Sequence, residues 1–195
     1  MAIEHEIKLR CDDLAAIRQR LEGSGGRRLG LVLEHNLMLD TPDGRLRAAD
    51  CGLRLRRRQT LDGHDAPTVL TFKGPRVLAA TAPLKSREEI EVTVEDADTL
   101  LALLGRLGFE PRLAYEKRRE TWRLGVCAVC LDELPLLGTF VEIEGPAPEA
   151  VHATRDALGL AAALSVAKTY VELAWEVGEP GADGVRRLSF ELRQR

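Results

Sequence analysis

The sequence predicts an α+β fold, an antiparallel barrel of about eight strands with helices packed on its outside. Charged and apolar residues alternate with a period of two along one segment after another, which is the pattern of strands. Leucine-rich segments of helical period lie between those strands and can cover their apolar faces. The charged faces also differ in sign from strand to strand, which favours a charge-lined interior.

The first half of the chain contains four predicted strands and one helix. The first strand places Glu4, Glu6, Lys8 and Arg10 on the face opposite Ile3, His5, Ile7 and Leu9. Asp12 and Asp13 can cap a helix that closes at Gly23. Strands are expected within residues 27–41, over 52–60 and over 68–73. On the third strand, Leu53 and Leu55 face away from a run of arginines, namely Arg54, Arg56 and Arg58.

The second half repeats this order of a charged strand followed by a leucine-rich helix. Residues 87–94 place Arg87, Glu89 and Glu91 on one face, and Glu88 with three apolar residues on the other. Asp96 or Asp98 can cap the next helix. Strands follow over 113–124, 126–134 and 139–144, and helices over 149–158 and 165–175. We expect one domain, residues 1–177, and a tail, residues 178–195, that begins with turn-forming residues.

Composition limits the class of protein. The chain has 195 residues, 45% apolar and 30% charged, with a net charge of −3, which is typical of a soluble globular protein and favours neither nucleic acid nor an anionic membrane as partner. No segment resembles a membrane helix or a signal peptide. We therefore expect a cytoplasmic protein with a small-molecule substrate, as a monomer or homodimer.

Cys127 and Cys130 have CxxC spacing, which occurs in redox motifs and in half-sites for zinc. The chain has no second CxxC and no nearby histidine pair. Positions i and i+3 of a strand also face opposite sides of the sheet. Buried structural thiols are therefore the preferred interpretation.

The charged strand faces segregate by sign. The cations are Arg54, Arg56, Arg58, Lys73, Lys117 and Arg119, and the carboxylates are Glu4, Glu6, Glu89, Glu91, Glu142 and Glu144. Charges inside a barrel are costly unless they pair or a ligand neutralises them. The alternative is an open α+β sheet whose polar faces lie in water, with salt bridges between strands.

The residue types on these faces suit phosphoryl transfer. Arginines two positions apart on a strand can bind phosphate oxygens through their forked donors. Carboxylates at the same spacing can hold one hard divalent cation. A cluster of cations beside a metal site is what phosphoryl transfer requires. The chain has no Walker motif.

Several motifs in a fixed order make the chain resemble the CYTH superfamily, also called triphosphate tunnel metalloenzymes. These enzymes include class IV adenylate cyclases, thiamine triphosphatases and inorganic triphosphatases, and their fold is an eight-stranded antiparallel barrel that forms a tunnel. The resemblance extends from Ile3 to about Leu173 and rests on Glu4-x-Glu6-x-Lys8, Leu53-Arg54-Leu55-Arg56, Thr71-Phe72-Lys73-Gly74, Arg87-Glu88-Glu89-Ile90-Glu91, Lys117-Arg118-Arg119, Leu131-Asp132, Val141-Glu142-Ile143-Glu144 and Ser165-Val166-Ala167-Lys168-Thr169-Tyr170.

The resemblance implies roles for individual residues. The residues expected to bind a triphosphate are Lys8, Arg54, Arg56, Lys73, Arg87, Lys117, Arg119 and Lys168. The expected ligands of Mg²⁺ or Mn²⁺ are Glu4, Glu6, Asp132, Glu142 and Glu144, and the expected catalytic residues are Glu4, Glu6 and Lys8.

These roles predict a metal-dependent triphosphatase that hydrolyses an inorganic or organic triphosphate, such as tripolyphosphate, thiamine triphosphate or a nucleoside triphosphate. Two alternatives remain at this point. A class IV adenylate cyclase would bind the triphosphate of ATP with the same residues and form cyclic AMP and pyrophosphate. A nucleotide pocket needs aromatic or apolar residues, so an aromatic content of 4% favours a smaller substrate. A polyphosphate-binding module without turnover would gain nothing from so many carboxylates.

Overall fold

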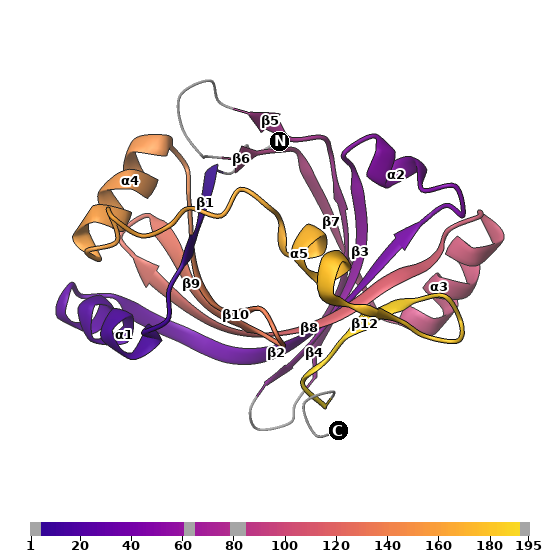
Figure 1. The fold of residues 1–195 in the computed structure, drawn as a ribbon, viewed down its shortest axis with the longest axis horizontal. Coiled ribbons are helices and arrows are strands. Elements are labelled where there is room, and N and C mark those ends of the chain that lie inside the picture. The colour runs from indigo at the N-terminus through magenta and orange to yellow at the C-terminus, as the bar shows by residue number, and fades with distance from the viewer. Residues whose placement is uncertain (1–4, 61–64, 79–84, 192–195) are drawn as a thin grey trace.

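The computed structural model describes residues 5–60, 65–78 and 85–191, and in this part of the chain a strongly curved sheet is surrounded by helices (Figure 1). The strands follow the order β5-β6-β1-β10-β9-β8-β2-β3-β4-β7, and all neighbours along this path are antiparallel. The elements are β1 (His5–Arg10), α1 (Leu14–Gly23), β2 (Arg27–Asp40), α2 (Arg45–Ala48), β3 (Gly52–Thr60), β4 (Asp65–Lys73), β5 (Val77–Leu78), β6 (Lys85–Ser86), β7 (Glu89–Val94), α3 (Ala97–Arg106), β8 (Glu110–Leu124), β9 (Cys127–Leu134), β10 (Gly138–Gly145), α4 (Pro148–Ala157), α5 (Tyr170–Val177), β11 (Glu179–Pro180) and β12 (Arg186–Leu188).

The predicted α+β architecture is confirmed. Eight of the described strands are long, namely β1, β2, β3, β4, β7, β8, β9 and β10, and together they curve around a central space. Between described residues, no backbone ladder joins the two ends of the sheet, β5 and β7. The sheet therefore has the tunnel-like curvature of a barrel without being hydrogen-bonded into a closed ring.

Local signals place the helix starts where the sequence indicates. The Asp13 carboxylate accepts a 3.0 Å hydrogen bond from the Ala16 amide at the start of α1. Asp96 accepts hydrogen bonds from the amides of Asp98 and Thr99 at the start of α3. These contacts satisfy amides that have no partner inside the first turn of a helix.

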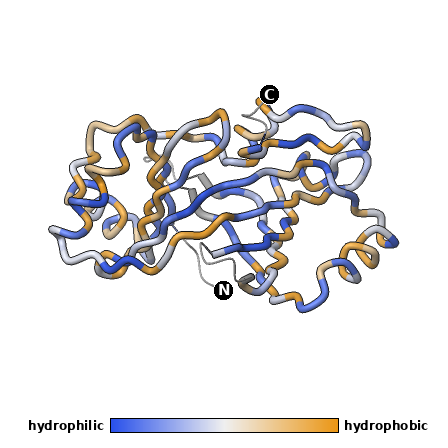
Figure 2. The backbone as a smooth tube through the Cα atoms, turned by 90° about the horizontal axis from the view of Figure 1, so that it is seen from below, coloured by the Kyte–Doolittle hydropathy of each residue, from blue (hydrophilic) through white to orange (hydrophobic). Residues whose placement is uncertain are grey.

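The apolar faces of most strands pack against helices, as the alternation predicts. Ile7, Val141 and Ile143 lie in one cluster with residues of α1 and α4. Leu53 and Leu55 lie in another with residues of α3. Hydrophilic and hydrophobic residues follow one another along the sheet in Figure 2. Burial of these faces outside the curve leaves the charged faces inside it.

β7 departs from this arrangement because part of its apolar face is uncovered. Ile90 and Val92 are both 55% exposed, whereas Val94 packs with the residues of α3. β7 is the last strand of the sheet on this side, so the helix that covers its neighbours reaches only its end.

The helix expected over residues 165–175 begins later, and its position differs from the prediction. The backbone before it pairs with β1: the Arg10 amide donates to Leu164 O and the Val166 amide to Lys8 O, at 2.9 and 2.8 Å. Thr169 then caps α5 together with Glu172 in a capping box. α5 lies across the inside of the curved sheet in Figure 1, while α1, α3 and α4 lie outside it.

The tail belongs to the sheet as far as Leu188. β12 pairs in parallel with β8, beyond the part of β8 that β9 occupies. Leu188 is buried in the same cluster as Leu113 and Tyr115. Within the described part of the chain, none of the helices has the length and apolar character that crossing a membrane requires.

Candidate active site

A cavity of about 590 Å³ lies on the inner face of the sheet. Among the residues that the structure describes, ten cationic and seven acidic side chains line it. The cations are Lys8, Arg47, Arg54, Arg56, Arg58, Lys73, Arg76, Arg87, Lys117 and Arg119, and the acids are Glu6, Asp50, Glu89, Glu91, Glu142, Glu144 and Glu172. The excess of positive charge favours an anionic ligand.

β1 and β10 bring three carboxylates together. Their register places Glu6 opposite Glu144 and Lys8 opposite Glu142. One oxygen from each of Glu6, Glu142 and Glu144 lies within 4.8 Å of the other two. Clustered carboxylate oxygens are the ligands that Mg²⁺ and Mn²⁺ prefer, so this donor set fits such an ion.

Lys8 is held beside this cluster. Its ammonium lies 3.1 Å from Glu142 Oε1, donates to the Lys168 carbonyl at 3.3 Å and sits 3.8 Å from the centre of the Tyr170 ring. Burial by itself lowers the pKa of Lys8, but Glu142 and Glu6 outweigh burial and raise that pKa above its ordinary value. Lys8 therefore carries its charge at the end of the cavity where the three carboxylates lie.

Arg119 joins the carboxylate cluster to a buried aspartate on β9. Its Nε and Nη2 donate to the two oxygens of Asp132 at 2.8 and 2.6 Å, and Nη2 also pairs with Glu142. Asp132 further accepts hydrogen bonds from Tyr170 and Lys117, and its side chain is 0% exposed. These partners occupy Asp132, which orients cations from behind the cavity wall.

The opposite wall is formed by arginines of β3. Arg56 donates through Nε to Asn36 Oδ1 at 2.8 Å, and Arg54 donates to Thr71 Oγ1 at 3.2 Å. Burial, together with the charge of Arg56, lowers the pKa of Arg54 to about 10. An anion in the cavity would reduce the electrostatic repulsion between these cations.

Lys73 completes this wall from β4. Its ammonium pairs with Glu89 of β7. Burial and the nearby Arg54 lower the pKa of Lys73. Arg87, which precedes β7, also lines the cavity.

Comparison with known families agrees with this geometry. The family model of the CYTH domain matches residues 2–180. The chain belongs to the CYTH domain family. Its fold is thus that of a CYTH domain, as the resemblance in the sequence predicts.

Two relatives of this CYTH domain come from archaea. The candidate adenylate cyclase MJ0240 of Methanocaldococcus jannaschii is 29% identical over 142 residues, which cover 73% of this chain and 76% of that protein. PH1819 from Pyrococcus horikoshii is 28% identical in sequence, and its structure matches with a TM-score of 0.75 over 89% of this chain and 98% of that one.

HpAC1 from the plant Hippeastrum has the same fold at 22% sequence identity, with a TM-score of 0.61 over 82% of this chain and 89% of that one.

The CYTH cavity contains most of the residues singled out from the sequence. Those that line it are Glu6, Lys8, Arg54, Arg56, Lys73, Arg87, Lys117, Arg119, Glu142 and Glu144. Glu4 lies outside the described residues. Lys168 is not on a helix and does not line the cavity; its side chain is 53% exposed and its ammonium lies 2.6 Å from Glu176.

Other residues of the site were not anticipated from the sequence. Glu34 and Asn36 of β2 contact the arginines of β3. They lie two positions apart on the same strand face as Met38, and this spacing in the sequence could have indicated that they face inward. Arg76 pairs with both Asp50 and Glu172, and these contacts join three segments that no local pattern connects. Cys127 and Cys130, by contrast, are the buried free thiols that the sequence predicts, and burial raises the pKa of Cys130 to about 12.

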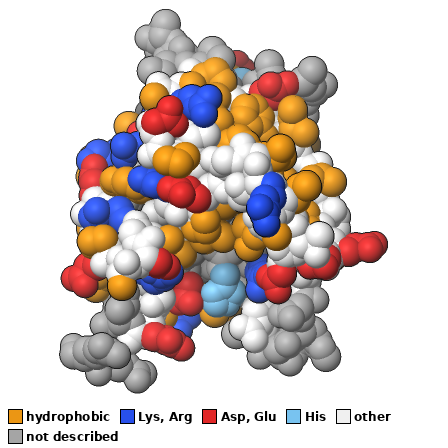
Figure 3. All heavy atoms as spheres, turned by 90° about the vertical axis from the view of Figure 1, so that its right-hand side faces the viewer, with side chains coloured by type: hydrophobic (Ala, Val, Ile, Leu, Met, Phe, Trp, Pro, Cys, Tyr) orange, Lys and Arg blue, Asp and Glu red, His pale blue; other side chains and the backbone are white. Residues whose placement is uncertain are grey.

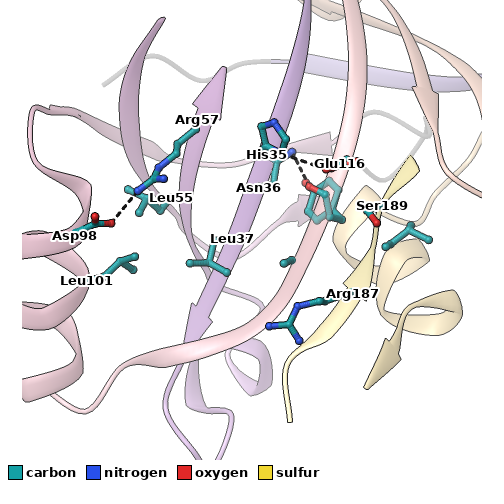
Figure 4. Close-up of a pocket in the computed structure, with 13 residues that line it drawn as sticks. His35, Asn36, Leu37, Leu55, Arg57, Asp98, Leu101, Glu116, Arg187 and Ser189 are labelled. Atoms are coloured by element: carbon teal, nitrogen blue, oxygen red, sulfur yellow. Dashed lines mark hydrogen bonds and ion pairs between the residues drawn. The ribbon is translucent and has the colours of Figure 1, made fainter. Parts of the chain in front are cut away.

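A second cavity, of about 460 Å³, lies on the other side of the sheet between α3 and the tail (Figure 4). Its floor includes Leu37, Leu55 and Leu101, and an ion pair between Arg57 and Asp98 stands at its rim. Figure 3 shows the side of the molecule on the right of Figure 1, where hydrophobic side chains gather between patches of charge. Among the described residues that line this cavity, basic and acidic side chains both occur, so these residues form no cluster of like charge for a phosphate group.

Proposed function

We propose that this CYTH domain is a metal-dependent triphosphatase. The observation that carries the proposal is the arrangement of one cavity, with arginines of β3 on one wall and the three-carboxylate cluster of β1 and β10 on the other. A triphosphate carries several negative charges along a short chain of phosphorus atoms. A cationic wall facing a metal site suits that shape and charge.

Each wall has a separate task. Arg54, Arg56 and Lys73 would hold the phosphate oxygens, with Arg87, Lys117 and Arg119 around them. Glu6, Glu142 and Glu144 would hold Mg²⁺ or Mn²⁺, which when bound neutralises charge on the phosphate oxygens. Glu6 would orient a water molecule toward the terminal phosphorus. Attack by that water releases phosphate from a diphosphate product, and little covalent chemistry is asked of the protein. Glu4 and Lys168 stay candidates from the sequence for the same site.

Adenylate cyclase is the second candidate, because the relative MJ0240 is a candidate adenylate cyclase. Adenine binding needs an aromatic or apolar surface beside the triphosphate. Among described lining residues the aromatic ones are Tyr115 and Tyr170, and the Tyr170 ring is already covered by Lys8. This favours a triphosphate recognised without its base. HpAC1, a candidate adenylyl cyclase of the same fold, has a dominant triphosphatase activity, so the fold accommodates hydrolysis.

The deciding experiment is product identification. The purified protein would be incubated with Mg²⁺ or Mn²⁺ and with tripolyphosphate, thiamine triphosphate or ATP. Hydrolysis of tripolyphosphate yields one pyrophosphate and one phosphate, which phosphorus NMR separates. Cyclic AMP with pyrophosphate as the main products from ATP would instead establish the cyclase, and absence of turnover on all three would overturn the proposal.

A further inference from the structure

Glu34 lies directly behind the cationic wall of the cavity. It is on β2, between β3 and β8, and its register places it opposite Arg58 on one side and Lys117 on the other. Its side chain is 1% exposed. The residue does not line the cavity, but three of the cations that do line it surround its carboxylate. None of the roles assigned above includes it.

Three ion pairs converge on this carboxylate. Glu34 Oε1 lies 3.1 Å from Arg56 Nη1 and 3.5 Å from Arg58 Nε, and Oε2 lies 3.4 Å from Lys117 Nζ. Burial by itself raises the pKa of Glu34, but Lys117 and Arg56 outweigh burial and lower that pKa well below its ordinary value. Glu34 is therefore a permanent negative charge inside a group of cations.

The same cations are those that a triphosphate would contact. A fixed carboxylate among them offsets part of their attraction for an anion, since each unit charge at this range acts on every charge of the ligand. It also orients the guanidinium groups, whose donors are directional. Tighter binding of substrate and product alike would not speed the reaction, and a product held too firmly would leave slowly.

We propose that Glu34 is a positioning residue that acts as an internal counter-anion: it orients Arg56, Arg58 and Lys117 and limits how tightly the cavity binds a polyphosphate. The inference rests on the proposed function in that the ligand is a triphosphate. It does not require that the triphosphate be hydrolysed, because it concerns the affinity of the cavity for a polyphosphate.

The test is the affinity of Glu34→Gln for tripolyphosphate and pyrophosphate, measured by calorimetry in the presence of EDTA. Glutamine keeps the shape of the side chain and removes its charge. We expect affinity for both anions to rise by about tenfold or more. Where the parent hydrolyses tripolyphosphate, kcat should fall while KM does not rise, and inhibition by pyrophosphate should become stronger. A residue with a purely structural role would weaken binding or leave it unchanged.

Glu120→Gln is the matched control. Glu120 is also a buried glutamate of a central strand, 5% exposed, and it bridges Arg18 Nε and Arg28 Nε at 2.7 and 2.6 Å without lining the cavity. Its replacement should lower the melting temperature and leave polyphosphate affinity unchanged. Glu34→Asp retains the charge and should bind tripolyphosphate with nearly parental affinity.

The outcomes separate this inference from the proposed function. If Glu34→Gln binds tripolyphosphate no more tightly than the parent, or weakens like a destabilised variant, the counter-anion role is wrong. If Glu34→Gln is folded but less stable than the parent when empty, a larger rise in its melting temperature with tripolyphosphate than the parent shows would support the role, and an equal or smaller rise would refute it. A parent that binds tripolyphosphate without hydrolysing it would overturn the triphosphatase and leave this affinity comparison decisive.

Discussion

The hydroxyl of Tyr170 donates a 2.8 Å hydrogen bond to Asp132, the residue that orients Arg119. The bond links α5 to β9 across the inside of the sheet. The ring of Tyr170 also lies 3.8 Å from the Lys8 ammonium. A single side chain thus supports a cation at each side of the three-carboxylate cluster.

Tyr170→Phe should lose the bond to Asp132 and keep the ring against Lys8. Because the bond ends on a buried carboxylate, we expect the free energy of unfolding to fall by about 1.5–3 kcal/mol, measured by urea denaturation. Turnover should fall as well, since Arg119 loses part of its support. A variant with parental stability would show that a water or another donor replaces the hydroxyl.

Arg56→Ala and Lys73→Ala should weaken tripolyphosphate binding and leave the fold intact. Each removes a charge-assisted contact worth about 1.5–3 kcal/mol. Arg57→Ala is the comparison, because that arginine is on the same strand as Arg56 but is exposed and paired with Asp98 outside this cavity. Calorimetric titration should show weaker binding for the first two variants and parental binding for the third. The opposite order would place the triphosphate on the outer face of β3.

Glu144→Gln should remove most turnover while tripolyphosphate binding survives better than activity. Glutamine keeps one oxygen but lacks the charge on which a hard divalent ion depends. Glu88→Gln is the control, since Glu88 is exposed and does not line the cavity. Activity would be titrated with Mg²⁺ and with Mn²⁺. Parental metal dependence in Glu144→Gln, or its loss in Glu88→Gln, would refute the metal assignment.

Tripolyphosphate with Mg²⁺ should raise the melting temperature of the parent, because it neutralises a cavity with an excess of cations. At 100 times its dissociation constant, a ligand that binds only the folded state stabilises it by about 2.7 kcal/mol. Sodium sulfate at equal ionic strength controls for general salt effects. A melting curve that millimolar tripolyphosphate leaves unchanged would contradict the anion site.

Acid should destabilise the protein partly through Glu34. Its pKa is lower in the folded state than its ordinary value of 4.5, so the unfolded chain binds the proton first as pH falls. The stability that Glu34 contributes is complete above pH 4.5 and declines as pH falls below that value toward the lower folded-state pKa. Unfolding free energies measured from pH 6 to pH 3, roughly the range in which carboxylates titrate, should decline less steeply in Glu34→Gln than in the parent. Equal slopes would mean that the pKa of Glu34 is the same in the folded and unfolded states.

Much of the fold could be predicted because its signals are local. Alternation along β3 alone separates Arg54 and Arg56 from Leu53 and Leu55, and the structure confirms both faces. The caps at Asp13 and Asp96 depend on residues within the same turn. The site followed from the same parity, because a strand face is inside or outside as a whole.

The parts that could not be predicted depend on contacts between distant segments. Residues 164–166 lack a helical backbone because β1 offers them hydrogen bonds, and no propensity near Ser165 indicates this. The parallel pairing of β12 with β8 is likewise a tertiary contact. Asp132 was expected beside the metal, but only its three donors, from β8 and α5, reveal that it supports the cations.

The pairing of β1 with β10 also has a consequence for how the protein is made. Glu6 leaves the ribosome well before its partner Glu144, because most strands of the described sheet lie between the two residues in the sequence. The hydrogen bond from the Val166 amide to the Lys8 carbonyl can form only later still, because Val166 follows Glu144 in the chain. Pairings between such distant segments form slowly, and an unpaired strand edge invites association with other chains. The β1 edge that pairs with β10 therefore stays open while the intervening strands are synthesised, and a product truncated before Glu144 would lack the carboxylate pair altogether.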